Sequence, residues 1–402
     1  MAARRIFLVL FSALVFTLLL LLTSCPQQKL DDYIPTPYEI EIPRFFPTKL
    51  NVPADNPMTV EGIELGRYLF YDGRLSGRTH KDSLMSCGTC HIQSRGFVCG
   101  IDHPKFTGGK TFGLTGIPTP HNMMPLINLV FNHNGYLWNG FIHPDNLHPA
   151  KRKLEDLVWM GVTAPHEMAG DTNRTVALFQ GIPGYPELFG RAFGSKKVTM
   201  KNIGRAIAQF ARTLISSNSK FDRYLRGEHQ LSEVELSGYV LFMTEEGADC
   251  FHCHGGGGNP MFTTNLFYNN GKDIIFNDPR DRYAITGDLN DIGAYRAPTL
   301  RNIEVTAPYM HDGRFATLEE VIDFYSHQVK QSPYVHPLMH HVSRGGVQLI
   351  PIEKSHLIAF IKTLRDDDFL TNPAFSTPAV FPDGSTQNLM PTWVSVPTVQ
   401  GF

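Results

Sequence analysis

Two copies of the pentapeptide C-x-x-C-H are the residues of this sequence whose types and spacing point most directly to a chemistry. They are Cys87-Gly88-Thr89-Cys90-His91 and Cys250-Phe251-His252-Cys253-His254. C-x-x-C-H is the attachment signature of a c-type haem. Two thiols at this spacing reach the vinyl groups on one edge of a porphyrin, and the imidazole that follows binds the iron. The sequence therefore predicts two covalently bound haem c groups.

A pair of C-x-x-C redox or metal-binding sites is the alternative interpretation of the same residues. Zinc is disfavoured because each copy already has its own histidine directly after the second cysteine. The chain has six cysteines, and haem attachment uses four of them, which leaves Cys25 and Cys99. We expect Cys99 to be a buried or idle thiol.

The length and charge of the chain limit its class. It has 402 residues and a formal net charge of −2. A chain of this length can form two or three domains. Since no run of basic residues is present, we expect no nucleic-acid partner.

The N-terminal segment has the pattern of an export signal. Arg4 and Arg5 precede an uncharged apolar run over residues 6–22, and the sequence LTSC ends at Cys25. This pattern predicts a lipoprotein-type signal peptide that is cut before Cys25, so that the lipidated cysteine anchors the protein to a membrane. The alternative is an uncleaved membrane anchor. Both interpretations place the chain on the periplasmic side, of either the inner or the outer membrane.

Helices are the elements expected to position the two pentapeptides. Ile203, Ile207 and Phe210 share one face of an amphipathic segment. Capping boxes that begin at Ser232 and Thr317 predict two further helix starts. The expected helices cover residues 60–70, 153–160, 201–215, 232–243, 317–325 and a last stretch from 351.

Loops are expected to make up much of the remainder. The segment from Gly96 to Gly116 is rich in glycine and predicts a long, mobile loop over a haem face. Strand signals are weak throughout the chain. The fold class is therefore mainly α, with long irregular loops.

Over about residues 57–370, the sequence resembles the bacterial di-haem cytochrome c peroxidase / MauG family. The motifs that carry the resemblance are ELGRYLFYDGRLS before the first pentapeptide, Trp138-Asn139-Gly140, Glu167-Met168 and the stretch at 296–325, RAPTLRNIEVTAPYMHDGRFATLEEVIDFY. The resemblance implies two cytochrome c-like domains, each with one covalently bound c-type haem. The N-terminal haem would meet peroxide, and the C-terminal haem would relay electrons.

Together, these patterns divide the chain into five expected segments. Residues 1–24 form the signal peptide, and residues 25–56 form a tether and lead-in. Residues 57–220 form the N-terminal, peroxide-binding domain, and residues 221–370 form the C-terminal, electron-transfer domain. Residues 371–402 form an irregular, loosely packed tail rich in proline and serine.

The resemblance implies roles for residues near the first haem. His91 would be its proximal ligand, and Glu167 would be the distal acid–base group that moves a proton between the two oxygens of peroxide. Partial burial would raise the pKa of Glu167 as such a shuttle requires; the alternative is an ordinary loop glutamate. Leu157 stands where the family usually has a glutamine. His103 would cap the iron at rest or be a solvated loop histidine, and His166 would assist proton transfer or lie on the surface.

For the second haem, the resemblance implies His254 as the proximal ligand and Tyr325 as the opposite ligand. MauG has a tyrosine at this place, where typical peroxidases have a methionine. A phenolate stabilises ferric iron and lowers the reduction potential relative to methionine. The alternative for Tyr325 is a core tyrosine. Three methionines are rival ligands: Met261, Met310 and Met339.

Two further sites are implied by the same motifs. Trp138 would carry electrons between the haems. A calcium ion would be bound by the side chain of Asn122 and the backbone carbonyls of Thr306 and Pro308, because oxygen donors suit a hard cation. Trp159 is expected to be a packing residue.

Three functions are therefore considered. The first is an exported di-haem peroxidase that reduces hydrogen peroxide with electrons from a small periplasmic donor, a cytochrome c or a cupredoxin. The second is a MauG-like enzyme that oxidises a protein or organic substrate at a distance. The third is a non-enzymatic electron carrier with both irons six-coordinate. The resemblance also allows a homodimer.

Overall fold

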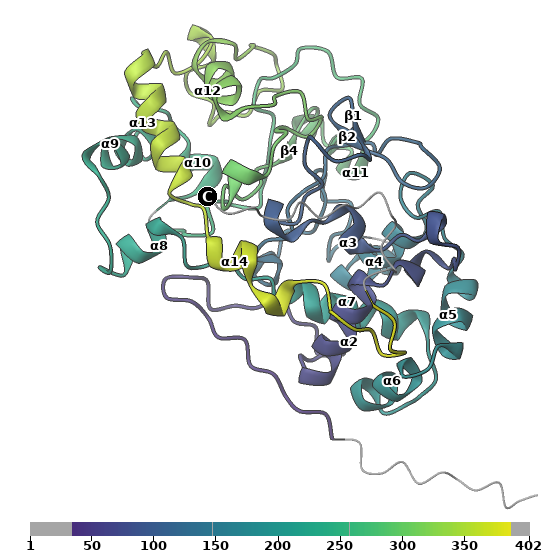
Figure 1. Cartoon of the computed structure of the whole chain (residues 1–402). Helices are drawn as coiled ribbons and strands as arrows, with labels where there is room; N and C mark the ends of the chain where they lie inside the picture. The colour runs from purple at the N-terminus through teal and green to yellow at the C-terminus, as the bar shows by residue number, and fades with distance from the viewer. Residues whose placement is uncertain (1–33, 147, 257, 387–402) are drawn as a thin grey trace, which may run out of the picture. The chain divides into compact units, whose positions relative to one another are not determined.

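The computed structural model describes residues 34–146, 148–256 and 258–386 (Figure 1). The predicted signal peptide, the lipidated Cys25 and the end of the tail lie outside the described residues. Among these residues, none of the helices has the length and apolar character needed to span a membrane. The described residues from Pro35 onward group into one unit.

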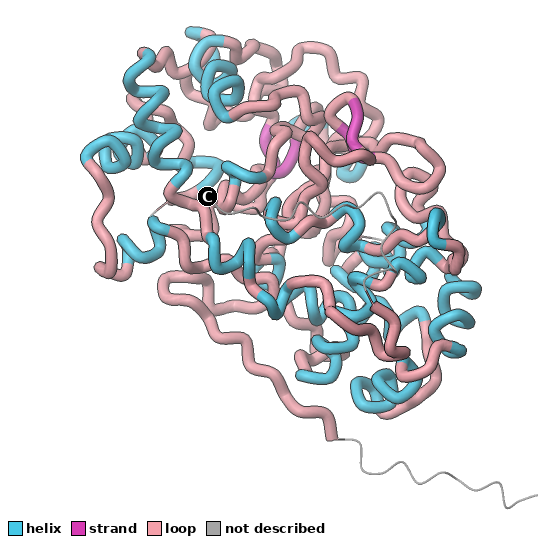
Figure 2. Tube along the Cα trace, viewed as in Figure 1, coloured by secondary structure: helices cyan, strands magenta, loops and turns pink. Residues whose placement is uncertain are grey.

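Helices are the main regular elements, as predicted, and long loops join them (Figure 2). In the first half of the chain they are α2 (Val60–Tyr71), α3 (Cys87–Cys90), α4 (Leu154–Thr163), α5 (Thr172–Gly181), α6 (Tyr185–Phe193) and α7 (Met200–Arg212). In the second half they are α8 (Lys220–Leu225), α9 (Glu233–Phe242), α10 (Phe251–His254), α11 (Tyr283–Thr286), α12 (Leu318–His327), α13 (Pro351–Lys362) and α14 (Asp367–Thr371).

The first hydrophobic core is built on the pair α2 and α7. Their backbones approach closely at Gly66, where a Cβ atom would lie 2.0 Å from the carbonyl oxygen of Ala206. Only glycine permits this approach. Phe70 of α2 and Phe210 of α7 are buried against each other, with ring centroids 5.3 Å apart. Since α3 follows α2, this pair positions the first pentapeptide.

The second core repeats this arrangement with α9 and α13. A Cβ atom on Gly238 of α9 would lie 1.9 Å from the carbonyl oxygen of His356 of α13. Phe221, Phe242 and Phe360 are fully buried around this contact. The predicted capping boxes at Ser232 and Thr317 are both formed, and each fixes the start of its helix. Since α10 follows α9, this pair positions the second pentapeptide.

In the part of the chain that the structure describes, four two-residue strands form two small antiparallel sheets. Strand β1 (Phe106–Thr107) pairs with β2 (Lys110–Thr111), and β3 (Phe267–Tyr268) pairs with β4 (Tyr295–Arg296). The weak strand signals of the sequence are consistent with such short pairings. The β1–β2 hairpin lies within the glycine-rich loop, so part of that loop has a regular structure.

The prediction of a loosely packed tail is wrong for its described residues. Phe381 is 2% exposed and belongs to the first hydrophobic core. Tyr71 donates a hydrogen bond from Oη to the carbonyl oxygen of Phe375 over 2.5 Å, and Arg74 pairs with Asp383 at 2.5 Å. The end of the chain therefore closes the first core, and composition could not show this because the partners are some 300 residues away in sequence.

Candidate functional site

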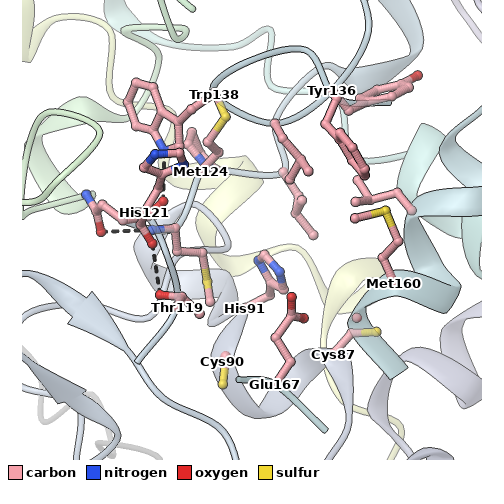
Figure 3. A pocket seen from close by; sticks show the side chains of 18 of the residues that line it. Cys87, Cys90, His91, Thr119, His121, Met124, Tyr136, Trp138, Met160 and Glu167 are labelled. Atoms are coloured by element: carbon pink, nitrogen blue, oxygen red, sulfur yellow. Dashed lines mark hydrogen bonds between the residues drawn. The ribbon is translucent and has the colours of Figure 1, made fainter. Parts of the chain in front are cut away.

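A cavity of about 630 Å³ lies beside the first pentapeptide (Figure 3). Its walls are mainly apolar, and its chemically reactive lining residues are Cys87, Cys90, His91, Glu167 and Trp138. This volume is typical of small-molecule and cofactor sites. The short helix α3 is held by Thr89, whose Oγ1 accepts a hydrogen bond from the backbone N–H of Ser86 over 3.0 Å.

The two pentapeptide histidines have the geometry of metal ligands. The Nδ1 atom of His91 lies 2.6 Å from the carbonyl oxygen of Phe97, and Nδ1 of His254 lies 3.0 Å from that of Pro298. Each N–H therefore donates to a carbonyl and leaves Nε2 available to a metal. Burial lowers the pKa of both imidazoles to about 4, so both are neutral at pH 7, as metal binding requires. With two cysteines beside each histidine, these residues fit a c-type haem.

Glu167 lines the first cavity and is the acidic group expected there. Its side chain is 42% exposed, and the cavity that it lines accounts for that exposure. Burial among the surrounding atoms raises the pKa of this carboxyl to about 7. Such a group changes its charge near neutral pH, as a general acid–base requires. Leu157 also lines the cavity. An apolar side chain therefore lies at the position where the family that the sequence resembles usually has a glutamine.

The glycine-rich loop holds the backbone at Glu167. The N–H of Gly113 donates to the carbonyl oxygen of His166 over 2.9 Å, and that of Leu114 donates to Glu167 over 3.0 Å. A Cβ atom on Gly113 would lie 1.7 Å from the carbonyl oxygen of Glu167, so a glycine is required here. The Nε2 atom of His166 lies 3.7 Å from Oε1 of Glu167. This part of the loop is fixed to the acid–base segment.

His103 and Cys99 lie together near the first pentapeptide. His103 is not among the described residues that line the first cavity. Its Nδ1 accepts a hydrogen bond from the backbone N–H of Lys105 over 3.0 Å, and its side chain lies close to Cys99. Cys99 is 1% exposed and lies close to Cys90. The structure thus places His103 against a thiol, and Cys99 is buried as predicted.

A second, smaller cavity of about 190 Å³ lies beside the second pentapeptide, and Tyr325 lines it together with Cys250, Cys253 and His254. Burial raises the pKa of the Tyr325 phenol above its usual range. Among the rival methionines, Met310 and Met339 line this cavity, whereas Met261 lines the first.

Asn270 was not found by sequence reasoning. Its Nδ2 donates a hydrogen bond to Oη of Tyr325 over 2.9 Å, and it lines the second cavity. In the sequence, Asn270 is one amide within a run of polar residues. Such a run does not reveal that the partner of this amide lies 55 positions later.

Trp138 lies between the two cavities, since it lines both of them. Its indole N–H donates to the carbonyl oxygen of Asn122 over 2.8 Å. The indole packs edge to face on His311, with ring centroids 6.3 Å apart. By contrast, Trp159 is buried in the first core, where its N–H donates to Met200 over 2.8 Å, as expected for a packing residue.

An aromatic cluster extends from Trp138. The rings of His311 and Tyr295 stack with centroids 3.5 Å apart. Tyr295 donates from Oη to Asp278 over 2.7 Å, and Nε2 of His121 lies 2.6 Å from the same carboxylate oxygen. Burial and the contact with the Asp278 carboxylate raise the pKa of Tyr295 above its usual range. Sequence reasoning missed this cluster because its members come from separate loops.

Two of the three predicted calcium ligands meet in the structure. The Nδ2 atom of Asn122 donates to the carbonyl oxygen of Pro308 over 2.7 Å. The same Nδ2 donates to the carbonyl oxygen of Met310 over 3.3 Å, and Oδ1 of Asn122 accepts from the backbone N–H of Met123 over 2.9 Å. Thr306 lies two residues before Pro308, and its hydroxyl donates to the carbonyl oxygen of Ile303 over 3.2 Å.

Comparisons with known proteins identify the class. The di-haem cytochrome c peroxidase family model matches residues 60–230. Cytochrome c551 peroxidase of Nitrosomonas europaea is 32% identical over 343 residues, which cover 83% of this chain and 87% of that protein. The methylamine utilization protein MauG of Methylorubrum extorquens is 30% identical and covers 79% of this chain and 82% of its own length. The chain therefore belongs to the di-haem cytochrome c peroxidase / MauG family and is an oxidoreductase.

Solved structures agree with this assignment. A MauG-like protein associated with microbial copper homeostasis is 35% identical, with a TM-score of 0.71, and covers 85% of this chain and 99% of its own. The di-haem peroxidase BthA of Burkholderia thailandensis has a TM-score of 0.64 at 18% identity, and this likeness concerns the fold alone. The predicted fold class, mainly α with cytochrome c-like domains, is confirmed.

Proposed function

We propose that this chain is an exported di-haem peroxidase that reduces hydrogen peroxide to water in the first cavity. The observation that carries the proposal is that Glu167, with its pKa raised to about 7, lines the same cavity as Cys87, Cys90 and His91. Reduction of one peroxide to two waters consumes two electrons and two protons. The cavity therefore needs a metal centre, a proton-transfer group and a route for electrons.

Cys87 and Cys90 would hold the first haem through thioether bonds, and His91 would bind its iron. When bound, this haem supplies the iron that binds peroxide and at which the O–O bond is broken. The carbonyl oxygen of Phe97 accepts from Nδ1 of His91, which fixes the orientation of the imidazole, and burial keeps the ring neutral. This support makes the ring a stronger donor to a metal.

Glu167 would move the proton. As a carboxylate it accepts the proton of the peroxide oxygen nearer the metal, and it then gives that proton to the departing oxygen, which leaves as water. A pKa near 7 suits both steps, since neither protonation state is costly to reach. Because Leu157 offers no amide to orient peroxide, we expect slower turnover than in an enzyme with a glutamine there.

The second cavity would be the entry point for electrons. Cys250 and Cys253 would hold the second haem, and His254 and Tyr325 would bind its iron. Electrons from a small periplasmic cytochrome c or cupredoxin would enter here. Trp138 would carry them to the first cavity, and its position in the walls of both cavities supports that role.

A MauG-like function is the second candidate. The observation that favours it is Tyr325 in the wall of the second cavity, since a phenolate ligand lowers the reduction potential of a haem. A second haem held by His254 and Tyr325 would take electrons from small cytochromes less readily than one with a methionine, and it would supply a site that can hold an oxidising equivalent. Trp138 would then connect both haems in oxidising a protein or organic substrate at a distance.

Further parts of the proposal concern location and assembly. The signal pattern supports export and an anchor through lipidated Cys25, on the periplasmic side of a membrane. Asn122, Thr306 and Pro308 would bind one calcium ion where the loops that carry them meet. The family resemblance also supports a homodimer.

Rapid mixing of the fully ferric protein with one equivalent of hydrogen peroxide tests the proposal. A prompt change in the haem absorption bands, lost in Glu167→Gln, supports chemistry in the first cavity and favours the MauG-like function. A reaction that requires prior reduction of one haem favours the donor-dependent peroxidase. No reaction in either state would contradict both enzymes and leave an electron carrier with six-coordinate irons.

A further inference from the structure

A group of metal-binding side chains lies beside the second pentapeptide. One ligand atom from each of Glu245, His252 and His340 lies within 4.8 Å of the other two. The Nε2 atom of His252 is 3.5 Å from Oε1 of Glu245, and the two imidazole rings are nearly perpendicular, with centroids 5.0 Å apart. Two imidazoles and one carboxylate form a donor set typical of zinc and other first-row divalent metals.

A single carboxylate supports both imidazoles. Asp249 accepts from Nδ1 of His252 at Oδ1 over 2.6 Å and from Nδ1 of His340 at Oδ2 over 3.1 Å. The Asp249 side chain is only 6% exposed, so these contacts form in a low-dielectric setting. Because each Nδ1 is engaged, each Nε2 is the atom left for a metal. A carboxylate behind a ligating histidine is the usual support in zinc sites.

The two loops that carry these residues are joined independently of any ion. Nε2 of His341 lies 2.6 Å from the carbonyl oxygen of Glu245, which ties the loop before α10 to the segment after α12. His340 and Asp249 also line the second cavity. His252 stands between Cys250 and Cys253, so the cluster borders the residues that attach the second haem.

We propose that Glu245, His252 and His340 bind one divalent transition-metal ion, such as Zn²⁺ or Cu²⁺, with Asp249 as the residue that positions both imidazoles. Calcium and magnesium are poor occupants because they prefer oxygen donors. This site is separate from the proposed calcium site and does not depend on the peroxidase function. A cation here stabilises the reduced second haem electrostatically, so metal binding raises the reduction potential of that haem.

Equilibrium dialysis of the full-length holoprotein against Zn²⁺, after treatment with a chelator, tests the site. We expect one zinc per chain in addition to two irons. His340→Ala should weaken zinc binding at least tenfold, and Asp249→Asn should weaken it on the order of 10–100-fold. Iron content should stay at two per chain in both variants. His229→Ala removes an exposed histidine between α8 and α9 and should bind zinc like the wild type.

Two further readouts are independent of enzyme activity. Cu²⁺ in place of zinc should give an electron paramagnetic resonance spectrum with nitrogen coupling, which His340→Ala should lose. Zinc should move the second-haem potential to more positive values in the wild type but not in His340→Ala. Absence of zinc binding by the wild type, or equal binding by His340→Ala, would overturn the site. An unchanged potential with zinc bound would overturn the electrostatic effect.

Discussion

Asn270 donates a hydrogen bond from Nδ2 to Oη of Tyr325 over 2.9 Å, in the wall of the second cavity. This contact orients the phenol oxygen and would stabilise its anionic form. Asn270 is held in turn, since its Oδ1 accepts from the backbone N–H of Lys272 over 3.3 Å. A specific hydrogen bond therefore holds the Tyr325 hydroxyl in the cavity wall, which packing in a hydrophobic core alone would not require.

Replacing Asn270 by leucine should lower the reduction potential of the second haem. A phenolate without its hydrogen bond donates more strongly to ferric iron and stabilises it. Hydrogen bonds to charged groups contribute about 1.5–3 kcal/mol, and a tenfold change in equilibrium corresponds to 59 mV for one electron, so a shift on the order of 100 mV is expected. A spectroelectrochemical titration measures this shift.

Tyr325→Phe is the companion variant for that measurement. It removes the proposed ligand oxygen and should change the absorption and paramagnetic resonance spectra of the second haem only. If both spectra stay as in the wild type, Tyr325 is a core residue, and Met310 or Met339, which also line the cavity, becomes the ligand to test.

The reaction with peroxide should depend on pH through Glu167. Burial raises the pKa of this carboxyl to about 7. The carboxylate, which accepts the peroxide proton, becomes populated as pH rises through 7. The second-order rate constant with peroxide should therefore increase with pH and level off above about pH 8. Glu167→Gln should lose this inflection and react roughly 10²–10⁴-fold more slowly.

His166→Ala is the control for the pH profile. Nε2 of His166 lies 3.7 Å from Oε1 of Glu167, and burial lowers the pKa of this imidazole below its ordinary value. The inflection near pH 7 should persist in this variant. Its persistence in Glu167→Gln instead would assign the titration to another group and contradict the proton-transfer role.

Trp138→Phe should slow electron transfer between the two haems. The indole lines both cavities, and its replacement removes the group that is most easily oxidised between them. Flash reduction of the second haem, followed by absorbance of the first, measures the rate. Trp159→Phe is the matched control, since this tryptophan is buried in the first core and lines neither cavity. Equal rates in the two variants would contradict the relay.

The sequence predicted those features that depend on local patterns. Apolar spacing predicted α7, and capping boxes predicted the starts of α9 and α12. The amphipathic segment was expected to reach residue 215, but α7 ends at Arg212, where the N–H of Thr213 donates to the carbonyl oxygen of Phe210 over 2.9 Å in a tighter last turn. The two pentapeptides indicated where the two cavities lie, because the two cysteines and the histidine that a c-type haem requires fall within five residues of each motif.

Features made by distant residues could not be predicted. No sequence motif surrounds Asn270, Tyr295 or Asp278. The roles of these residues depend on hydrogen bonds to partners elsewhere in the chain. The cluster of Glu245, His252 and His340 joins segments almost 90 residues apart. His340 had no partner that the sequence could name, since its hydrogen bond to Asp249 exists only after both cores have formed.

Asp222→Asn should destabilise the second core. Asp222 holds Arg301 through two hydrogen bonds of 2.6 and 2.8 Å, and Arg301 is 0% exposed. The substitution leaves a buried guanidinium without a counter-charge, and breaking a buried pair in this way costs about 3–5 kcal/mol of unfolding free energy. Denaturant unfolding of the haem-loaded protein measures the loss. Asp323→Asn removes an exposed partner of Lys354 and should cost about 1 kcal/mol or less.

The pH dependence of stability supplies an independent check on the same pair. Burial alone would raise the pKa of Asp222, but the hydrogen bonds and charge of Arg301 hold that pKa below its usual value of 3.8. A carboxyl with a lowered pKa in the folded state stabilises the protein above its unfolded pKa, and this stabilisation is lost as pH falls through the folded value. The difference in unfolding free energy between wild type and Asp222→Asn should therefore be constant at neutral pH and shrink below about pH 4. A difference that is independent of pH would show that the variant is destabilised by altered packing and not by the lost charge.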